Sequence, residues 1–507
     1  MTRWLDRVTG KVTMYRLILL ALIALAVEAI LVSLVGELQP YTALGILVAA
    51  AVAIAVSYLS NRLLALLFRV KPHSESSLVT ALILLFLFRP ILDGPSLLAI
   101  ALAALLANAT KYLLAIRRRH VFNPAAAGAF ITGLILPLNA PGWWVATPWL
   151  LPLVVVAALV ILFRTRHLTL GVVFVVVAAV TVVVTLTGYG QTPGAALSTA
   201  FSSFPIVFLA GFMLSEPLTL PPRRWQQLVE AVLVGLLFGL MATGFHLGPV
   251  YASPQLALLV GNLLAFLVGQ RRGIRLEYLG KSQLSPTSWE LSFKPRRQVT
   301  FAAGQFMELT VPHGGADVRG LRRTFSIASA PSAPDVVAFG LRTAERSSSF
   351  KKTLLAMKPG ESVTATSVGG DFVLPRDPKV PVLLVAGGIG ITPFVSQLAH
   401  AAATGEQRDT VLVVSSSSST DIAYLERLDF DGPRILLVAP DRPADLPANW
   451  EYLGTGPVTA ELLLAAVPDA RGRHAYVSGP PNLVHNLKPA LRRAGLRRVH
   501  SDYFSGY

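Results

Sequence analysis

A short motif in the C-terminal half, R-T-F-S from Arg323 to Ser326, combines side chains that could bind a flavin nucleotide. The arginine can grip a diphosphate with two donors, and the aromatic ring of Phe325 can stack on a flavin. The hydroxyl of Ser326 would then lie close to the flavin ring. Thr324 completes the motif, which lies on a strand leaving a loop. Taken alone, a tetrapeptide of this kind is usually only a piece of strand.

A glycine-rich turn, G-G-I-G-I-T-P from Gly387 to Pro393, follows an apolar run. Glycines let a ligand approach the backbone closely, and Thr392 with Pro393 can begin a helix whose N-terminal amides face an anion. The spacing differs from the usual G-x-G-x-x-G fingerprint, so a simple turn is the alternative interpretation. A third motif, S-G-P-P from Ser478 to Pro481, again lies between an apolar strand and a helix.

Two patterns of secondary structure would position these motifs. From Gly273 onward, short alternating strands such as W-E-L-S-F at Trp289–Phe293 predict a small antiparallel barrel over residues 273–376. After Asp377 the pattern becomes apolar strand, glycine-rich turn and helix, which predicts a parallel α/β domain over residues 377–507.

The first 272 residues are expected to form a polytopic α-helical membrane domain. The whole chain is 53% hydrophobic and 14% charged, against about 25% charged residues in an average soluble protein. A span needs about 20 largely apolar residues, and we identify about ten candidate runs, some of them short. Their approximate cores are Leu17–Val35, Ala43–Leu59, Leu78–Phe88, Leu97–Ile116, Pro124–Leu136, Leu150–Phe163, Leu168–Leu186, Phe201–Leu214, Val229–Phe245 and Gln255–Val268.

Charge predicts the orientation of this domain in the cell membrane. Alternate loops carry the basic residues, and the loops between them contain almost no Lys or Arg, with Arg89 as the exception. By the positive-inside rule, the N-terminus and the C-terminal half lie in the cytoplasm. The net charge of +16 is interpreted in this way rather than as nucleic-acid binding. The basic residues are Arg62, Arg69, Lys71, Arg117–Arg119, Arg164, Arg166, Arg223, Arg224, Arg271 and Arg272.

Other residue types narrow the chemistry. The absence of cysteine excludes disulfides, thiolate-held iron–sulfur clusters and Cys-ligated zinc, so redox chemistry must use organic cofactors or haem. No metal site is predicted. Polar residues within apolar runs mark candidate functional positions, chiefly Glu28, then Asn108, Lys111 and Asn262. Alternatively, Lys111 extends to the interface and Asn262 joins helices.

In order and spacing, the three motifs resemble the ferredoxin–NADP reductase family over essentially all of Gly273–Tyr507. The resemblance implies an FAD-dependent NAD(P)H oxidoreductase with three catalytic residues. Ser326 would lie near the reactive ring nitrogen, and Ser478 replaces the cysteine that many members have beside the nicotinamide. Phe504 would cover the flavin until nicotinamide displaces it, with Tyr503 as the competing candidate.

The same resemblance implies the remaining cofactor contacts. The segment Arg346–Lys351, R-S-S-S-F-K, would hold the FAD diphosphate through backbone amides. NADP-preferring members usually place an Arg after the second strand of the nucleotide domain. The corresponding stretch, Val413–Asp421, has none, so we expect NADH rather than NADPH. The implied cofactor-binding residues are Arg323, Thr324, Phe325, Ser326, Ser348, Ser349, Gly387, Gly388, Gly390, Thr392, Pro393, Gly479 and Pro480.

Two motifs of the membrane half, H-V-F-N-P-A-A-A-G-A-F at His120–Phe130 and F-M-L-S-E-P-L-T-L-P-P at Phe212–Pro222, resemble a second family. It contains the membrane subunits D of the Rnf complex and B of the sodium-pumping NADH:quinone reductase. The similarity covers most of Thr110–Arg224 and implies cofactor binding at Asn123 and Thr219. The matching positions are Asn123, Pro124, Glu216, Pro217 and Thr219.

The membrane half departs from that family at the flavin attachment site. Family members carry FMN covalently on the threonine of an S-G-A-T sequence, which is missing from the corresponding stretch, Thr187–Thr199. Thr192 or Thr199 could replace it. Covalent FMN, a non-covalent flavin, a quinone site and no cofactor all remain open.

The expected function is to pass electrons from NADH through FAD into or across the membrane domain. The acceptor would be a flavin, a quinone or an extracytoplasmic molecule, with other electron-transfer subunits as further candidate partners. One alternative is a ferric-reductase-like enzyme. It would be haem-free, because paired histidines at both membrane depths are missing and only His246 lies near the outer face. Another alternative is a flavin transporter or membrane anchor fused to a soluble reductase.

Overall fold

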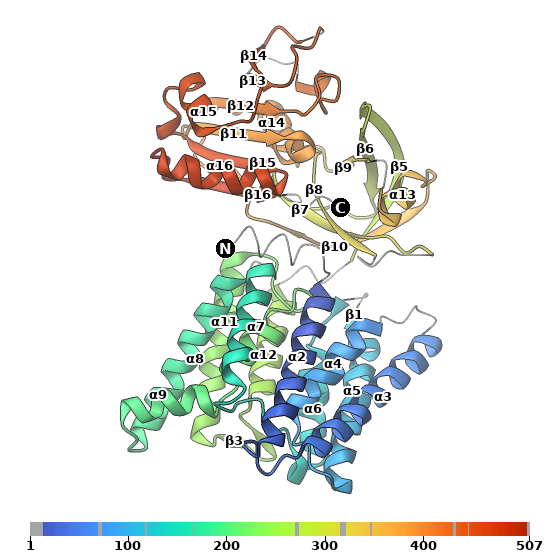
Figure 1. The fold of residues 1–507 in the computed structure, drawn as a ribbon. Coiled ribbons are helices and arrows are strands. Elements are labelled where there is room, and N and C mark those ends of the chain that lie inside the picture. The colour runs from blue at the N-terminus through green and yellow to red at the C-terminus, as the bar shows by residue number, and fades with distance from the viewer. Residues whose placement is uncertain are drawn as a thin grey trace. The chain divides into compact units, whose positions relative to one another are not determined.

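The computed structural model describes residues 14–68, 74–116, 119–165, 167–268, 273–314, 321–344, 347–428, 432–444 and 446–503. The chain forms two compact units, Met1–Arg271 and Arg272–Tyr507, which are described separately (Figure 1).

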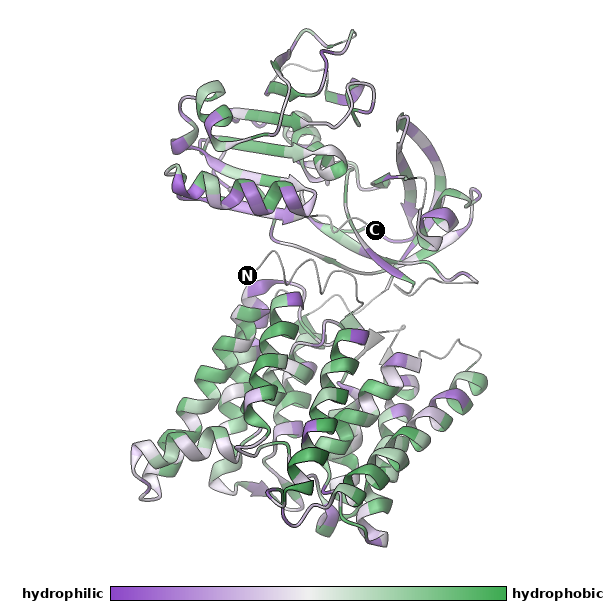
Figure 2. Ribbon diagram, viewed as in Figure 1, coloured by the Kyte–Doolittle hydropathy of each residue, from purple (hydrophilic) through white to green (hydrophobic). Residues whose placement is uncertain are grey.

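The N-terminal unit is a helical bundle in which hydrophobic residues cover most of α2, α3 and α8 (Figure 2). Polar N-cap side chains begin several helices: Thr42 accepts from Gly45 N, and Asn123 accepts from Ala126 N. The helices are α2 Met14–Leu34, α3 Ala43–Leu67, α4 Ser74–Leu87, α5 Gly94–Leu113, α6 Pro124–Ile135, α7 Leu151–Thr165, α8 Leu168–Gly188, α9 Pro193–Ser202, α10 Ile206–Phe208, α11 Arg224–Gly239 and α12 Pro254–Val268. A π-helix η2, Leu209–Leu214, continues α10, and 3₁₀ turns η1 and η3 cover Pro137–Asn139 and Leu240–Thr243. Short strands pair as β1 Ala115–Ile116 with β2 Arg119–His120, and β3 His246–Leu247 with β4 Val250–Tyr251.

Fewer helices can cross a membrane than the ten expected. Among the described residues, five are long and apolar enough: α2, α3, α5, α8 and the continuous segment Arg224–Thr243. A sixth candidate is the pair Pro193–Ser202 and Ile206–Leu214, which is bent by 50°. Helices α4, α6, α7 and α12 are shorter, at 12–15 residues. At 1.5 Å per residue they fall short of the ~30 Å hydrocarbon layer, so the expectation of about ten spans is not shown.

The two halves of this bundle repeat one packing scheme. In the first half α5 packs against α3 and α6, and in the second half α11 packs in the same way against α8 and α12. Glycine allows a close approach in each half. A Cβ atom on Gly128 would lie 2.6 Å from the carbonyl oxygen of Ala103, and one on Gly211 would lie 2.5 Å from Cβ of Ala158. The short elements α4 and α10–η2 are almost fully buried in their respective halves.

The flavin sheet, our name for the antiparallel sheet of the C-terminal unit, has six strands in the order β8-β7-β10-β5-β6-β9. Their bounds are β5 Ile274–Ser285, β6 Ser288–Pro295, β7 Phe306–Thr310, β8 Arg322–Ser326, β9 Val337–Arg342 and β10 Ser362–Gly369. Helix α13, Ser349–Leu355, lies between β9 and β10 in the chain. The predicted barrel is not closed, because β8 and β9 are the two edges of the sheet, and the described residues join them by one isolated bridge, from Ile327 to Phe339, just past the end of β8.

The nucleotide sheet is parallel throughout, as the sequence predicts, in the order β14-β13-β12-β11-β15-β16. Its strands are β11 Val382–Gly387, β12 Thr410–Ser415, β13 Arg434–Val438, β14 Trp450–Gly454, β15 His474–Gly479 and β16 Val499–Tyr503. Its helices are α14 Thr392–Thr404, α15 Ala460–Ala466 and α16 Pro481–Arg493, with 3₁₀ turns η4 Gly388–Ile391, η5 Glu426–Leu428 and η6 Ala470–Gly472. The strand order reverses between β11 and β15, and ligands of such sheets bind at that point, outside the carboxyl ends of the strands.

Candidate cofactor site

The two glycine turns of the nucleotide sheet meet at the point where the strand order reverses. Gly387 ends β11 and Gly479 ends β15. A Cβ atom on Gly390 would lie 2.5 Å from Cα and 2.7 Å from N of Gly479. A Cβ atom on Gly387 would lie 2.8 Å from Cδ of Pro480. The G-G-I-G and S-G-P-P motifs therefore pack directly against each other, Gly387 and Gly390 leave no room for a side chain at this contact, and the bare backbone of the two turns is the candidate cradle for a nucleotide.

Ser478 directly precedes Gly479 at the end of β15. Its residue is fully buried, and its Oγ has no hydrogen-bond partner among the described residues. An unsatisfied buried hydroxyl costs about 1–3 kcal/mol. A polar group of a bound nucleotide would remove that cost, so the residues present fit a pyridine nucleotide here.

Other residues of the second motif have packing roles. Gly388 has a φ of 52°, in the left-handed region that favours glycine. Thr392 is 1% exposed, and its hydroxyl donates to Ile389 O at 3.1 Å. The methyl group of Thr392 would be 2.5 Å from a Cβ atom on Gly340 of β9. Thr392 and the buried Pro393 thus begin α14 and pack it against the flavin sheet.

The R-T-F-S motif and α13 come together on the other side of the site. Arg323, 6% exposed, has its guanidinium 5.2 Å from the ring centroid of Phe350 in α13. Phe325 stacks on the same ring, with centroids 6.0 Å apart and planes 20° apart. Phe350 follows Ser348 and Ser349 in the chain. Arg323, which is expected to hold the FAD diphosphate, therefore contacts α13, whose first amides are expected to bind the same diphosphate. Ser348 caps α13 by accepting from Lys351 N at 3.3 Å.

The structure qualifies the role expected for the aromatic ring. The Phe325 ring packs between Phe350 and Phe339, whose centroid is 6.2 Å away, within the core of the flavin sheet. Thr324 is exposed and Ser326 is buried. His313, which sequence reasoning missed, approaches Ser349 Oγ at 3.0 Å through Nε2.

Part of the predicted site lies outside the described residues. This applies to Arg346 and Phe504, and nothing is described for the side chain of Tyr503. The backbone of Tyr503 pairs with Gly479, so the chain leaves β16 beside the S-G-P-P turn.

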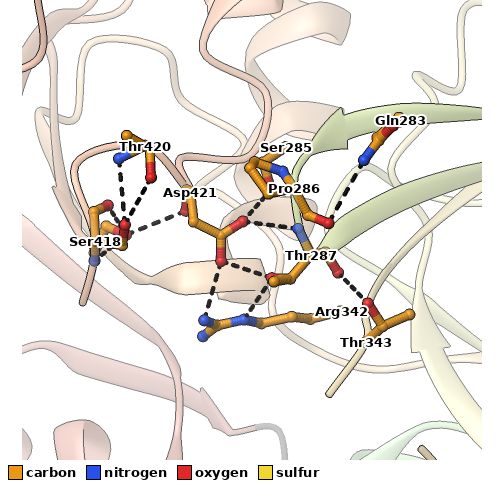
Figure 3. A network of polar contacts seen from close by, with 10 residues as sticks. Gln283, Ser285, Pro286, Thr287, Arg342, Thr343, Ser418, Thr420 and Asp421 are labelled. Carbon is orange, nitrogen blue, oxygen red and sulfur yellow. Dashed lines mark hydrogen bonds and ion pairs between the residues drawn. The ribbon is translucent and has the colours of Figure 1, made fainter. Parts of the chain in front are cut away.

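A polar network missed by sequence reasoning joins the two sheets (Figure 3). Asp421, from the segment after β12, accepts hydrogen bonds from Ser285 Oγ at 2.5 Å and Thr287 Oγ1 at 2.6 Å. Arg342 Nη2 lies 3.0 Å from Asp421 Oδ2. Burial alone would raise the pKa of Asp421, but these hydrogen bonds and the Arg342 charge together hold it below its ordinary value.

In the N-terminal unit, the two resemblance motifs also meet. Asn123 Nδ2 donates to Glu216 Oε2 at 2.8 Å, and Thr219 Oγ1 donates to Glu216 O at 3.2 Å. Asn123 N donates to Asn262 Oδ1 at 2.8 Å. Nδ2 of Asn262 is buried and has no partner in the described part of the chain. Lys111 donates to Thr80 Oγ1 at 2.8 Å, so it bonds to α4.

The candidate threonines for covalent flavin do not join this group. Thr192 is exposed and caps α9 by accepting from Ala195 N at 3.4 Å. Thr199, partly buried on α9, bonds through its carbonyl to Ser203 N.

Comparisons with known proteins bear on the C-terminal unit. Residues 384–488 match the oxidoreductase NAD-binding domain. The reductase subunit of an aromatic O-demethylase from Amycolatopsis sp. is 30% identical over 218 residues, covering 41% of this chain and 62% of that protein. The reductase subunit of a stachydrine N-demethylase from Rhizobium meliloti is 23% identical over 236 residues, covering 45% and 66%. A crystal structure of an Amycolatopsis cytochrome P450 reductase has a TM-score of 0.40 and 25% identity, covering 46% of this chain and 71% of that one.

The C-terminal half carries a ferredoxin–NADP reductase-like module. For this module, the predicted FAD and NAD(P)H cofactors and the class of FAD-dependent NAD(P)H oxidoreductase are confirmed. The chain spans less than two thirds of the length of either curated relative above. The family match lies within residues 384–488, and the resemblance of Thr110–Arg224 to a second family stays a prediction.

Proposed function

We propose that the chain is a membrane-bound oxidoreductase that takes electrons from NADH through FAD and delivers them into or across its N-terminal unit. The contact between the turns at Gly390 and Gly479 carries the redox part of the proposal, because it lies at the switch point of a parallel sheet, where such sheets bind nucleotides. The lipid bilayer and an electron acceptor would be its partners.

The residues of the chain would bind and orient the reactants. FAD, when bound, accepts a hydride from NAD(P)H and releases electrons singly. Arg323 and the amides at the start of α13 would hold the FAD diphosphate, with Arg323 supplying a planar pair of donors. The glycine turns would admit the nucleotide backbone, and the orphaned Ser478 hydroxyl would hydrogen-bond near the nicotinamide. Ser326, buried at the end of β8, would face the reactive edge of the flavin.

NADH is favoured over NADPH by the segment after β12. Val413–Asp421 contains no arginine to meet a 2′-phosphate, and its one charged residue, Asp421, already accepts from the flavin sheet. The 2′-phosphate of NADPH would therefore find hydroxyl groups but no positive charge in this stretch.

Lipid contact by the N-terminal unit is supported by an exposed apolar stripe. On α8, side chains at four-residue spacing are 52–65% exposed. A stripe of this kind is stable in hydrocarbon and unfavourable in water. The residues are Val172, Val176, Val180 and Val184. Together with the basic loops, the stripe supports a multi-pass protein of the cell membrane with the reductase module in the cytoplasm.

The acceptor would be reached through the N-terminal unit. The Asn123–Glu216–Asn262 group offers buried polar atoms for a flavin such as FMN or for a quinone, and delivery to an extracytoplasmic acceptor or to further subunits is also compatible. The matched relatives are reductase subunits of larger systems by name. A transporter role for this unit is a second candidate, favoured by the repeated packing and by the break between α9 and α10.

The test is the flavin content and reduction of purified full-length protein. Released FAD and FMN are separated, the denatured band is checked for covalent fluorescence, and the bound flavin is mixed anaerobically with NADH or NADPH. We expect FAD that NADH bleaches faster than NADPH. A second, FMN-type flavin would support electron transfer through the membrane half. FAD alone would contradict a flavin acceptor there, and unbleached FAD would contradict the redox proposal.

A further inference from the structure

The segment that follows β12 belongs to the nucleotide sheet in sequence but is bonded to the flavin sheet. We name residues 421–428 the docking segment. Its sequence is D-I-A-Y-L-E-R-L, and three of its side chains contact strands β5, β6 and β9. These contacts fix how the two sheets of the C-terminal unit face each other.

Asp421 is the most extensively bonded of the three. Its Oδ1 accepts from Ser285 Oγ at 2.5 Å and from Thr287 N at 3.1 Å. Its Oδ2 accepts from Thr287 Oγ1 at 2.6 Å and Arg342 Nη2 at 3.0 Å. Figure 3 shows the carboxylate pointing away from Ser418 and Thr420 toward these donors. With two donors on each oxygen and 7% exposure, the carboxylate is saturated by the flavin sheet.

Arg427 and Tyr424 supply two further anchors. Arg427 donates to Glu290 of β6 through both terminal nitrogens, at 2.9 and 2.6 Å, and Glu290 is 1% exposed. Tyr424 has a φ of 66°, in the left-handed region that bulky residues rarely adopt. Its hydroxyl would lie 2.8 Å from a Cβ atom on Gly340 of β9. Such backbone strain persists only where the surroundings over-determine it.

Arg342 connects the Asp421 anchor to the nucleotide cradle. Its Nε donates to Thr287 Oγ1 at 3.0 Å, which ties it to the turn between β5 and β6. Its Nη1 lies 3.8 Å from the position of a Cβ atom on Gly388, the left-handed glycine of the cradle. The anchor thus extends from the flavin strands through one guanidinium to the turn that would hold the pyridine nucleotide.

We propose that Asp421 is a positioning residue for hydride transfer, holding the nucleotide cradle at the correct distance from the flavin sheet through Ser285, Thr287 and Arg342. This inference rests on the redox function proposed above. Hydride transfer requires near-contact of the reacting atoms, and a displacement of about 1 Å can reduce the rate by about a hundredfold. None of the four donors to Asp421 comes from the R-T-F-S motif or from α13, so binding of FAD should not depend on it.

An acidic residue beyond the glycine turn of a dinucleotide-binding domain often bonds to the ribose hydroxyls. Asp421 does not have that geometry, because all of its accepting positions are filled from the flavin sheet. Its role is therefore to orient the cradle and not to recognise the nucleotide.

The first experiment compares Asp421→Asn with the unaltered full-length protein. Asparagine keeps the shape but loses the charge that pairs with Arg342. We expect normal FAD content and unchanged NADH affinity, and a limiting rate of flavin reduction lowered about tenfold, equivalent to about 1.4 kcal/mol. Reoxidation of chemically reduced enzyme by ferricyanide should be unchanged, because it bypasses the cradle.

A second readout is independent of activity. Hydrogen–deuterium exchange without nucleotide should be faster at the Thr287 amide and across residues 421–428 in Asp421→Asn than in the unaltered protein. The matched control is Glu451→Gln. It removes an exposed ion pair, 2.7 Å between Glu451 Oε2 and Arg434 Nη2, that joins two strands of the nucleotide sheet. It should change neither the exchange nor the flavin reduction rate.

The outcomes separate this inference from the redox proposal. If NADH fails to reduce the unaltered protein, the redox proposal fails. If NADH reduces both proteins equally fast, Asp421 has no positioning role. If Asp421→Asn loses FAD, the positioning role is tested with Ser285→Ala instead. This variant removes only one of the four donors to Asp421. A smaller rate defect with intact FAD supports the inference, and an unchanged rate overturns it. Arg342→Gln must also be non-additive with Asp421→Asn.

Discussion

Gly390 and Gly479 belong to turns 89 positions apart in the chain, yet a Cβ atom on Gly390 would lie 2.5 Å from Cα of Gly479. Real Cβ atoms essentially never approach other atoms so closely. The contact joins the ends of β11 and β15 at the switch point of the sheet. The nucleotide cradle that we propose is therefore built by the two turns together.

Gly390→Ala should therefore move the two turns apart and weaken nucleotide binding. We expect at least a tenfold loss of NADH affinity with FAD content unchanged, because the residues proposed to contact the flavin lie on β8 and α13. Titration of the purified protein with NADH under anaerobic conditions measures the NADH affinity. Gly472→Ala is the control, since nothing lies within 4 Å of its Cβ position. Equal affinities in the two variants would contradict the cradle.

Arg323→Lys should lower FAD retention, although the charge is kept. Lysine has a compact ammonium in place of the planar guanidinium, so it offers no planar pair of donors to a diphosphate and cannot place a planar cation over the Phe350 ring as Arg323 does. We expect about a tenfold weaker affinity for FAD, measured by reconstituting the flavin-free protein. Arg322→Lys, at the neighbouring position facing the other side of β8, is the matched control and should retain FAD. Equal retention would show that Arg323 has a structural role only.

The motifs were predictable because each depends on local chemistry. Glycines in the second and third motifs are dictated by backbone approach, and the apolar strand before each turn is visible in the sequence. The parallel sheet follows from the alternation of strands and helices. The match of residues 384–488 to an NAD-binding domain agrees with that interpretation.

Contacts between distant segments were not predictable from one sequence. Asp421 lies 136 positions from Ser285, and Arg427 lies 137 positions from Glu290. Nothing local marks either residue as a partner of the flavin sheet. The open edge between β8 and β9 was missed for a similar reason, because alternation predicts strands but not whether a sheet closes. The apolar runs at Leu78–Phe88 and Pro124–Leu136 do form helices, α4 and α6, but at 14 and 12 residues these are shorter than the ~20 residues that a span needs.

The ion pair between Glu290 and Arg427 should respond asymmetrically to substitution. Glu290 is 1% exposed and Arg427 is 50% exposed. Arg427→Met removes the ion-pair partner of a buried carboxylate and should lower the free energy of unfolding by about 3 kcal/mol. Glu290→Gln leaves only a half-exposed cation and should cost about 1 kcal/mol. Urea unfolding of the C-terminal unit, with the release of flavin as the signal, measures the change in unfolding free energy for both variants. Equal losses of unfolding free energy in the two variants would contradict the burial of Glu290.

The Asp421 carboxylate should make the stability of the C-terminal unit pH-dependent. Its pKa is held below the ordinary value near 4 in the folded state. Its contribution is therefore present above the unfolded pKa and is lost as pH falls through the folded pKa. The difference in unfolding free energy between the unaltered protein and Asp421→Asn should be constant above about pH 5 and shrink in more acidic buffers. A difference that does not vary with pH would contradict this linkage.

Asn123→Ala tests the polar group of the N-terminal unit. The substitution removes the bond to Glu216 and the cap of α6, which costs about 1–2 kcal/mol by loss of the cap alone. If the group receives electrons, NADH should still reduce FAD at the normal rate. Onward transfer to quinone or to an external acceptor in proteoliposomes should then fall at least tenfold.

Thr42→Ala is the matched control, because Thr42 caps α3 by accepting from Gly45 N at 3.1 Å and takes no part in the hydrogen bonds described for Asn123 and Glu216. It imposes a similar loss of stability on the same unit without disturbing the polar group. Onward transfer that falls in Asn123→Ala and persists in Thr42→Ala would locate the electron path at Asn123. Similar behaviour of the two variants would mean that Asn123 only begins a helix, and the acceptor would then have to be sought elsewhere.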